Sequence, residues 1–243
     1  MNLRIFNVGV GLAHAVQGVL MLALSNSLSL PVTASWLTGD PVVARTPDPP
    51  HEVFSLAIGP AVALFLFLAA ADHLLVAAPG VYRSYERLID DNRNYMRWIE
   101  YSVSAAIMMV LIARFTGITD LAALMGTFAL TTSMILFGLL MERQQHPRCA
   151  DWSAFWFGSL AGAVPWVAVL IYLVNGASPP GFVYAIVVVQ FAFFFSFAVN
   201  MALQYRRVGR WRDYRFGEVA YTFLSLGAKS VLAWLVFANV LRT

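Results

Sequence analysis

Seven long apolar segments dominate this sequence, and they constrain its fold more than any other feature. A helix needs about 20 mostly apolar residues to cross the hydrocarbon core of a bilayer. Sixty per cent of the residues are hydrophobic and 12% are charged, whereas about a quarter of the residues in a soluble domain are charged. We therefore predict an all-α membrane protein, a single bundle of seven transmembrane helices over residues 1–243. The predicted spans are about 3–24, 52–77, 97–116, 120–142, 152–174, 181–205 and 214–241.

The first apolar segment could also be read as a signal peptide. It is as long as a full span, however, so we interpret it as the first helix. The single cysteine, Cys149, excludes a disulfide framework and a zinc site made of four cysteines.

Basic residues in the connections predict the orientation of the bundle. Short cytoplasmic loops carry an excess of lysine and arginine. With the N-terminus inside, twelve arginines lie at the cytoplasmic face and only Arg45, Arg114 and Arg242 lie outside. We therefore predict a multi-pass protein of the cell membrane with a cytoplasmic N-terminus and an extracellular C-terminus.

The one long connection is the predicted outer loop, residues 25–51. Apolar and small polar residues alternate from Leu28 to Trp36, which is typical of a strand with one apolar face. Gly39 to Pro41 could turn the chain into a second strand through Val42 and Val43. The sequence thus predicts a short β-hairpin. It would serve either as a lid over the helix ends or as a dimerisation surface, since an isolated hairpin is marginally stable in water.

A lone lysine lies in the middle of the last span. The chain has fifteen arginines, in connections or near helix ends, and one lysine, Lys229. A lysine at the centre of a transmembrane helix costs roughly 2.5–3.5 kcal/mol, so it has to be paired, neutralised or functional. Its neutral amine can attack an aldehyde and form a Schiff base, which an arginine cannot do. Three interpretations remain open: a structural ion pair with a buried carboxylate, a Schiff base, or part of an ion pathway.

The third span supplies a carboxylate partner for this lysine. Glu100 lies within the apolar run, where an unpaired acid is expensive, and Ser104 follows one turn later on the same face. We interpret Arg97, one turn earlier, as the residue that ends the helix at the lipid headgroups. Ser104, Met108 and Leu111 occupy the turns beyond Glu100, so a second acid is missing there.

Polar side chains form a stripe on the last span. Glu218, Thr222, Ser225 and Lys229 are spaced four, three and four residues apart, and therefore lie on one helical face. The stripe begins at the predicted cytoplasmic end and stops at the lysine. It could hydrate the amine from that side only.

Two histidines are expected inside the bundle. His14 and His73 are either hydrogen-bonded contacts between helices or members of one polar pocket with Glu100 and Ser225. A zinc or haem enzyme would need more ligands than two interior histidines provide, and we predict that the protein is not an enzyme. Four aromatic residues could clamp a flat polyene: Phe193, Phe197, Trp166 and Trp234.

The segments "RWIEYSVSAAIMMVLIARFTGITD" (97–120) and "AKSVLAWLVFANVL" (228–241) resemble helices 3 and 7 of the heliorhodopsins. The predicted cytoplasmic N-terminus and the long outer loop agree with this resemblance, which extends over essentially the whole chain. It implies that all-trans retinal is the cofactor, that Lys229 forms its Schiff base and that Glu100 is the sole carboxylate counterion. It also implies a polar cavity around His14 and His73. Hydroxyls near the linkage would come from Ser104 and Ser225, and a ring contact from Trp234.

The resemblance further implies a non-pumping light sensor with a slow photocycle and a signalling or regulatory role. We expect retinal, membrane lipid, a second copy of the chain and a cytoplasmic signalling protein as partners, and no nucleic acid. The basic connection from Arg206 to Arg215 serves either as ordinary membrane anchoring or as a site for anionic lipid or an acidic protein. The alternative function is an ion or proton channel or transporter that uses the Lys229–Glu100 pair.

Overall fold

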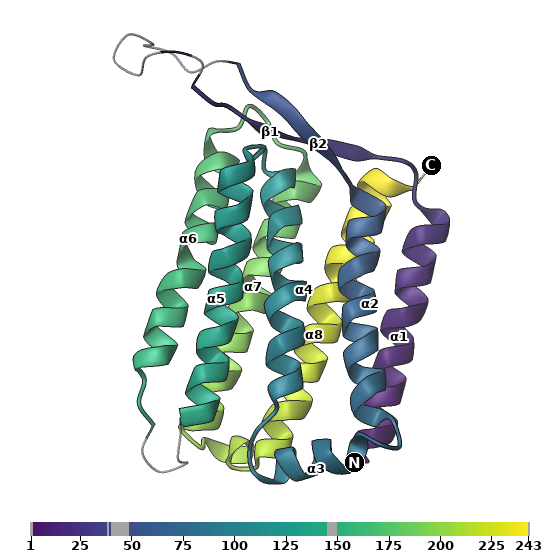
Figure 1. Ribbon diagram of the computed structural model, residues 1–243, viewed down its shortest axis with the longest axis vertical. Helices are drawn as coiled ribbons and strands as arrows, with labels where there is room; N and C mark the ends of the chain where they lie inside the picture. The colour runs from purple at the N-terminus through teal and green to yellow at the C-terminus, as the bar shows by residue number, and fades with distance from the viewer. Residues whose placement is uncertain (1, 38, 40–48, 145–149, 243) are drawn as a thin grey trace.

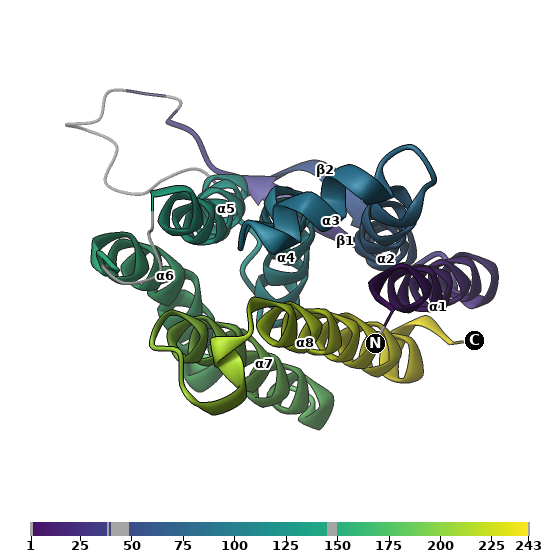
Figure 2. The same cartoon turned by 90° about the horizontal axis from the view of Figure 1, so that it is seen from below.

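The computed structural model describes residues 2–37, 39, 49–144 and 150–242. Seven helices in this part of the chain are long and apolar enough to cross a membrane, which confirms the predicted architecture. They stand side by side as one bundle (Figures 1 and 2). The spans are α1 (Leu3–Leu24), α2 (Ile58–Ala77), α4 (Tyr95–Phe115), α5 (Leu121–Gln144), α6 (Ser153–Asn175), α7 (Gly181–Tyr205) and α8 (Tyr214–Val236), which continues into a π-helical turn, Phe237–Leu241.

Polar side chains begin three of these helices at the end of the bundle that holds the N-terminus. Asn2 precedes α1, Asn94 precedes α4 and Asp213 precedes α8, and each accepts a hydrogen bond from a backbone N–H of the first turn. Such caps satisfy backbone donors that have no partner within the helix. They fix where the three helices begin.

α4 is the most enclosed of the seven spans. In its most apolar stretch 61% of the residues are buried, against 50% or less in the other six. It lies between α2, α5 and α8 (Figure 2). A charged residue in the middle of α4 therefore faces other helices rather than lipid, and this position brings Glu100 into the interior.

The predicted β-hairpin is present, but its second strand is not where we expected it. β1 (Ser29–Ala34) pairs in antiparallel fashion with β2 (His51–Ala57). The predicted second strand at Val42 and Val43 lies outside the described residues. Residues 52–57, which we had assigned to the start of the second span, belong to β2, so that boundary was wrong.

Pro60 gives the physical reason for the later start of α2. In a helix that began at residue 52, the ring of Pro60 would clash with the carbonyl group of Leu56. In the observed helix Pro60 lies in the first turn, where its missing N–H needs no partner. The apolar character of the segment continues through both elements, so hydropathy alone could not separate strand from helix.

The hairpin is attached to the end of the bundle opposite the N-terminus (Figure 1). The Thr33 backbone N–H donates to the Thr119 carbonyl at 2.9 Å, and the hydroxyl oxygens of the two threonines are 3.0 Å apart. Just before β1, the Asn26 backbone N–H donates to the Leu241 carbonyl at 2.8 Å, and its side chain donates to the Val240 carbonyl at 3.0 Å. The hairpin segment thus holds the α4–α5 turn and the last turn of the final span.

A short helix that the sequence analysis missed, α3 (Tyr82–Asp90), lies at the N-terminal end of the bundle. Tyr85 and Ile89 are its buried residues. Its nine residues are too few and too polar for a span. The α7–α8 connection at the same end contains one 3₁₀ turn, Gly209–Arg212. Which end of the bundle faces the cytoplasm stays a prediction.

Candidate functional site

Lys229 and Glu100 meet in the interior of the bundle. The Lys229 Nζ atom lies 3.2 Å from Glu100 Oε2 and donates to Ser225 Oγ at 2.8 Å. Both charged side chains are almost fully buried, at 4% and 6% exposure. Buried ions of opposite charge stabilise each other only in close contact, and each would be costly alone. The structure therefore brings together three of the residues that the sequence singled out.

Tyr101 is a fourth member of this site, which sequence reasoning missed. The Lys229 Nζ atom lies 4.8 Å from the centre of its ring, in a cation–π arrangement. Its hydroxyl donates to the Tyr221 carbonyl of α8 at 3.1 Å, which fixes the ring. The available signal was its position next to Glu100, but one residue along a helix points about 100° away and gives no hint of a shared site.

A pocket of ≈ 400 Å³ opens beside the lysine. At its polar end lie Lys229, Ser225 and Ser104. Its remaining walls are mostly apolar and come from α4, α5 and α7: Tyr101, Ala105, Met108, Met134, Ile135, Phe194 and Phe197, with Ala228 from α8. The arrangement suits a long apolar molecule that carries one reactive polar end.

Two buried oxygen atoms at the polar end have no protein partner. Among the described residues, Glu100 Oε1 and Ser104 Oγ have no hydrogen-bonding atom in reach. Buried polar groups are generally paired, so these oxygens mark a place where a bound group can supply the contact. Ser104 itself is fully buried.

The two histidines lie together between α1 and α2. The rings of His14 and His73 stack with centroids 6.0 Å apart and an interplanar angle of 7°. His73 Nδ1 shares a 2.7 Å hydrogen bond with Asn7 Oδ1. Both imidazoles are buried. The structure thus places the two histidines as neighbours of each other.

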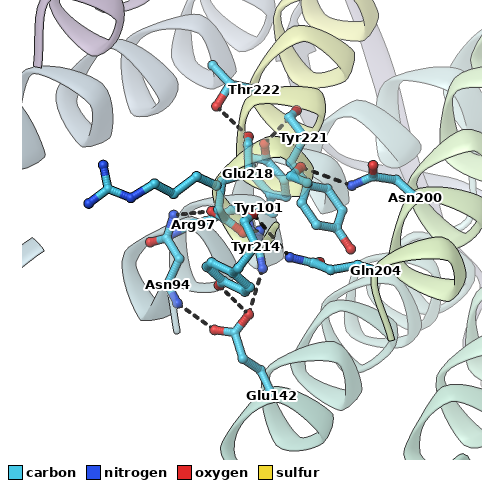
Figure 3. Close-up of polar contacts among 12 residues, drawn as sticks. Asn94, Arg97, Tyr101, Glu142, Asn200, Gln204, Tyr214, Glu218, Tyr221 and Thr222 are labelled. Carbon is cyan, nitrogen blue, oxygen red and sulfur yellow. Dashed lines mark hydrogen bonds and ion pairs between the residues drawn. The ribbon is translucent and has the colours of Figure 1, made fainter. Parts of the chain in front are cut away.

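Arg97 does not end its helix at the lipid headgroups, and our interpretation of it was wrong. Its guanidinium is buried between two carboxylates, in contact with Glu218 of α8 and 2.8 Å from Glu142 of α5 (Figure 3). It also lies 4.0 Å from the centre of the Tyr221 ring. A buried arginine requires such partners. These partners are 45 and 121 residues away along the chain, so local sequence context could not reveal them.

Two further side chains complete this buried ion cluster, which we define as Arg97, Glu142, Glu218, Asn94 and Tyr214. Asn94 donates its backbone N–H to Glu142 at 2.6 Å and its amide to Glu218 at 2.7 Å. The Tyr214 hydroxyl donates to Glu142 at 2.9 Å. The cluster joins α4, α5 and α8 (Figure 3). The cluster lies between the Lys229–Glu100 pair and the N-terminal end of the bundle.

The predicted ring contact, Trp234, lies away from the pocket. Its indole N–H donates to Gln17 of α1 at 3.0 Å, and the residue is 38% exposed. Of the other aromatic residues proposed as a clamp, Phe197 lines the pocket. Trp166 packs edge-on against Phe194, which lines the pocket.

Comparison with known proteins identifies the family. Residues 3–241 match the sequence profile of the heliorhodopsins. The chain belongs to the heliorhodopsin family. Its fold is similar to the crystal structure of a light-driven proton pump, LR (Mac), from Leptosphaeria maculans, with a TM-score of 0.69 over 98% of this chain and 94% of that chain. The two sequences are 13% identical, so this likeness concerns the fold alone. Among proteins of curated function, none matches this sequence.

Membership of this family makes the chain a retinal rhodopsin and a multi-pass membrane protein. The residues of the pocket fit that chromophore. A buried amine stands at one end, apolar and aromatic side chains line the rest, and two unpaired oxygens lie beside the amine.

Proposed function

We propose that this heliorhodopsin is a light sensor in which Lys229 binds all-trans retinal through a Schiff base and Glu100 is the counterion. The observation that carries the proposal is the contact between the Lys229 Nζ atom and Glu100 Oε2, 3.2 Å apart, at the polar end of the apolar pocket. A lysine is the side chain that condenses with an aldehyde. A buried carboxylate beside it favours the positively charged form of the linkage.

Retinal, when bound, supplies visible absorption and a light-driven change of shape. The protein's own residues hold the charge around it. Glu100 balances the positive charge, and Ser225 accepts a hydrogen bond from the Lys229 nitrogen at 2.8 Å. The Tyr101 ring lies against the same nitrogen. The Ser104 hydroxyl faces the pocket from one turn further along α4.

The polar side chains that α8 itself carries around Lys229 are one-sided, which supports sensing rather than pumping. On the buried face of α8 beyond the lysine, Leu232, Ala233 and Val236 are all apolar and fully enclosed. Toward the N-terminal end lie Ser225 and Glu218. Glu100, in contact with the Lys229 nitrogen, is the acceptor that a released proton meets, and the proton returns from it by the same route. A net transfer across the membrane needs acceptors on both sides.

The output of such a sensor would be a conformational change read at the N-terminal end of the bundle. We place this end in the cytoplasm because the arginines of the connections concentrate there. α8 carries Lys229, and its first turn follows directly on the basic α7–α8 connection. A cytoplasmic signalling protein would bind there.

We also propose that two copies of the chain associate through the hairpin. Trp36, Val53 and Phe54 are 52%, 47% and 48% exposed on it. Exposed apolar groups of this kind mark interaction surfaces. The double variant Val53→Glu/Phe54→Glu should halve the mass measured by light scattering in detergent. An unchanged dimer would assign the interface to another surface.

The main test is the visible spectrum of the protein expressed with all-trans retinal. The wild type should show a visible band, and Lys229→Ala should lose it. Lys229→Arg is the matched control, because it keeps a positive charge beside Glu100 but cannot form a Schiff base. It should fold and remain colourless. Glu100→Gln should shift the band to longer wavelength, since the charge that stabilises the ground state is removed.

Three results would contradict the proposal. A folded wild type without a visible band would show that the pocket does not bind retinal. A visible band in Lys229→Arg would show that Lys229 does not form the Schiff base. A steady light-driven pH change outside vesicles, or a photocurrent, would favour the alternative function of an ion or proton transporter or channel.

A further inference from the structure

A second pocket lies at the N-terminal end of the bundle. It has a volume of ≈ 480 Å³ and forms where the α7–α8 connection meets the end of α5 and the turn after α3. The retinal site does not use it. Its lining combines two arginines, Arg207 and Arg212, with the amides of Asn92 and Gln204 and the ring of Trp211.

The arginines of the α7–α8 connection fall into two groups. Arg206 lies over the Trp152 ring at 5.4 Å, and Arg210 lies over the Phe216 ring at 4.6 Å. Arg215, at the start of α8, pairs with Asp90 at 2.6 Å. These three guanidinium groups already have partners within the protein.

Arg207 and Arg212 are the two arginines of the connection that line the pocket. In the part of the chain that the structure describes, neither forms an ion pair. Arg212 Nε donates to the Arg207 carbonyl at 3.3 Å, which holds the two residues together and leaves the terminal nitrogens of Arg212 available. The pocket therefore carries two adjacent positive charges without an ion-pair partner among the described residues.

The only acid in the described lining is already satisfied. Glu142 belongs to the buried ion cluster, where one carboxylate oxygen accepts from the Asn94 backbone and the other from Arg97 and Tyr214. Figure 3 shows Glu142 joined to Asn94, Arg97 and Tyr214. Glu142 shares Arg97 with Glu218, and among the described residues it forms no ion pair with Arg207 or Arg212.

Trp211 provides a fixed aromatic wall. Its indole N–H donates to Asn200 Oδ1 at 2.7 Å, and its ring meets Phe216 edge-on with centroids 4.9 Å apart. A wall held in this way offers apolar contact area at little cost in side-chain entropy.

We propose that this pocket binds a phosphate monoester, with Arg207 and Arg212 holding the phosphate and Trp211 covering the attached group. A phosphate monoester carries roughly −1.5 to −2 charges at pH 7, which matches two guanidinium groups. Planar guanidinium groups bind phosphate oxygens through paired hydrogen bonds. The ester could be the headgroup of a lipid with a terminal phosphate or a soluble metabolite. The proposal does not rest on the retinal site.

The test measures binding of phenyl phosphate to the full-length protein in phosphatidylcholine nanodiscs, by calorimetry in the dark and in phosphate-free buffer. The wild type should bind it. Arg207→Gln/Arg212→Gln should weaken binding at least about tenfold, since charged hydrogen bonds are lost. Arg206→Gln/Arg210→Gln removes the same charge from arginines outside the pocket, and should change the affinity less than about twofold.

The source of the ester is read from a second set of nanodiscs that contain phosphatidic acid. Loss of phenyl phosphate binding there would assign the site to a lipid headgroup, and retained binding would assign it to a soluble ester. Equal weakening by both double variants would overturn the proposal, because the attraction would then come from general surface charge. It would also be overturned if the wild type did not bind phenyl phosphate in phosphatidylcholine nanodiscs. Neither outcome depends on a visible band, so failure here is distinct from failure of the retinal proposal.

Discussion

Arg97 and Glu100, one turn apart on α4, form ion pairs of opposite polarity with the same neighbouring helix. Arg97 contacts Glu218 of α8, and Glu100 contacts Lys229 of α8. If α4 slid along α8 so that Arg97 faced Lys229, or so that Glu100 faced Glu218, like charges would meet. The two pairs therefore fix the position of α4 against α8 along their shared axis, in addition to any chemistry at the lysine.

Loss of Arg97 should destabilise the protein strongly. Arg97→Met leaves the Glu142 and Glu218 carboxylates buried without a cation, and breaking a buried ion pair in this way costs about 3–5 kcal/mol. The free energy of unfolding in detergent is the measurement. The triple variant Arg97→Met/Glu142→Gln/Glu218→Gln removes all three charges and should recover much of the loss. A cost below about 1 kcal/mol, as found for exposed pairs, would mean that the cluster is hydrated.

Tyr101 contributes through two separable contacts. Tyr101→Phe removes the hydrogen bond to the Tyr221 carbonyl and should cost about 1 kcal/mol of stability, with little change in the visible band. Tyr101→Leu also removes the ring beside Lys229 and should shift the band. Identical spectra for the two variants would show that the ring does not act on the lysine.

Gly162 of α6 should control the shape of the pocket beside Lys229, which we propose as the retinal site. A Cβ atom at this position would collide with the sulfur of Met134, which lines the pocket. Gly162→Ala should therefore push Met134 inward and reduce the yield of pigment formed with retinal. Gly126→Ala in α5 is the matched control, because its Cβ would meet no atom within 4 Å. Equal pigment yields in both variants would contradict the tight contact.

The Asn7–His73 hydrogen bond should couple the two residues, so that the effects of replacing them on the free energy of unfolding are not additive. Asn7→Leu leaves the buried His73 Nδ1 without its partner and should cost about 1–3 kcal/mol. Asn7→Leu/His73→Phe replaces both polar groups and should be less destabilised than the single variant. Thermal unfolding of the two variants and of His73→Phe completes the cycle. Additive effects would show that the contact contributes no coupling.

The seven spans could be predicted because a helix in lipid needs a long run of consecutive apolar residues, and such runs are visible in the sequence. The start of α2 could not be placed by hydropathy, since the apolar residues Val53, Phe54, Leu56 and Ala57 of β2 lead directly into the apolar helix. Pro60 was the usable signal. α3 was missed because its nine residues owe their helix to the burial of Tyr85 and Ile89 against the bundle, which is a tertiary effect.

The meeting of Lys229 and Glu100 could be predicted because each is an expensive charge in an apolar span, and each needs a partner. Their roles with retinal stay predictions. Arg97 misled us for a related reason: an arginine near a helix end resembles a headgroup contact, and its acids lie on two other helices. Trp234 could not be oriented, because an aromatic residue in a span has no charge that demands a particular neighbour.

The two hydrogen bonds from Asn26 to the last turn of the final span have a mechanical consequence. They act as a pivot. The 28 residues from Tyr214 to Leu241 form a rod about 42 Å long. A tilt of about 3° around its pinned end would displace the opposite end by about 2 Å, with Lys229 near the middle of the lever. We therefore expect a small local movement at the lysine to be amplified toward Tyr214 and the connection before it, while the hairpin end stays still.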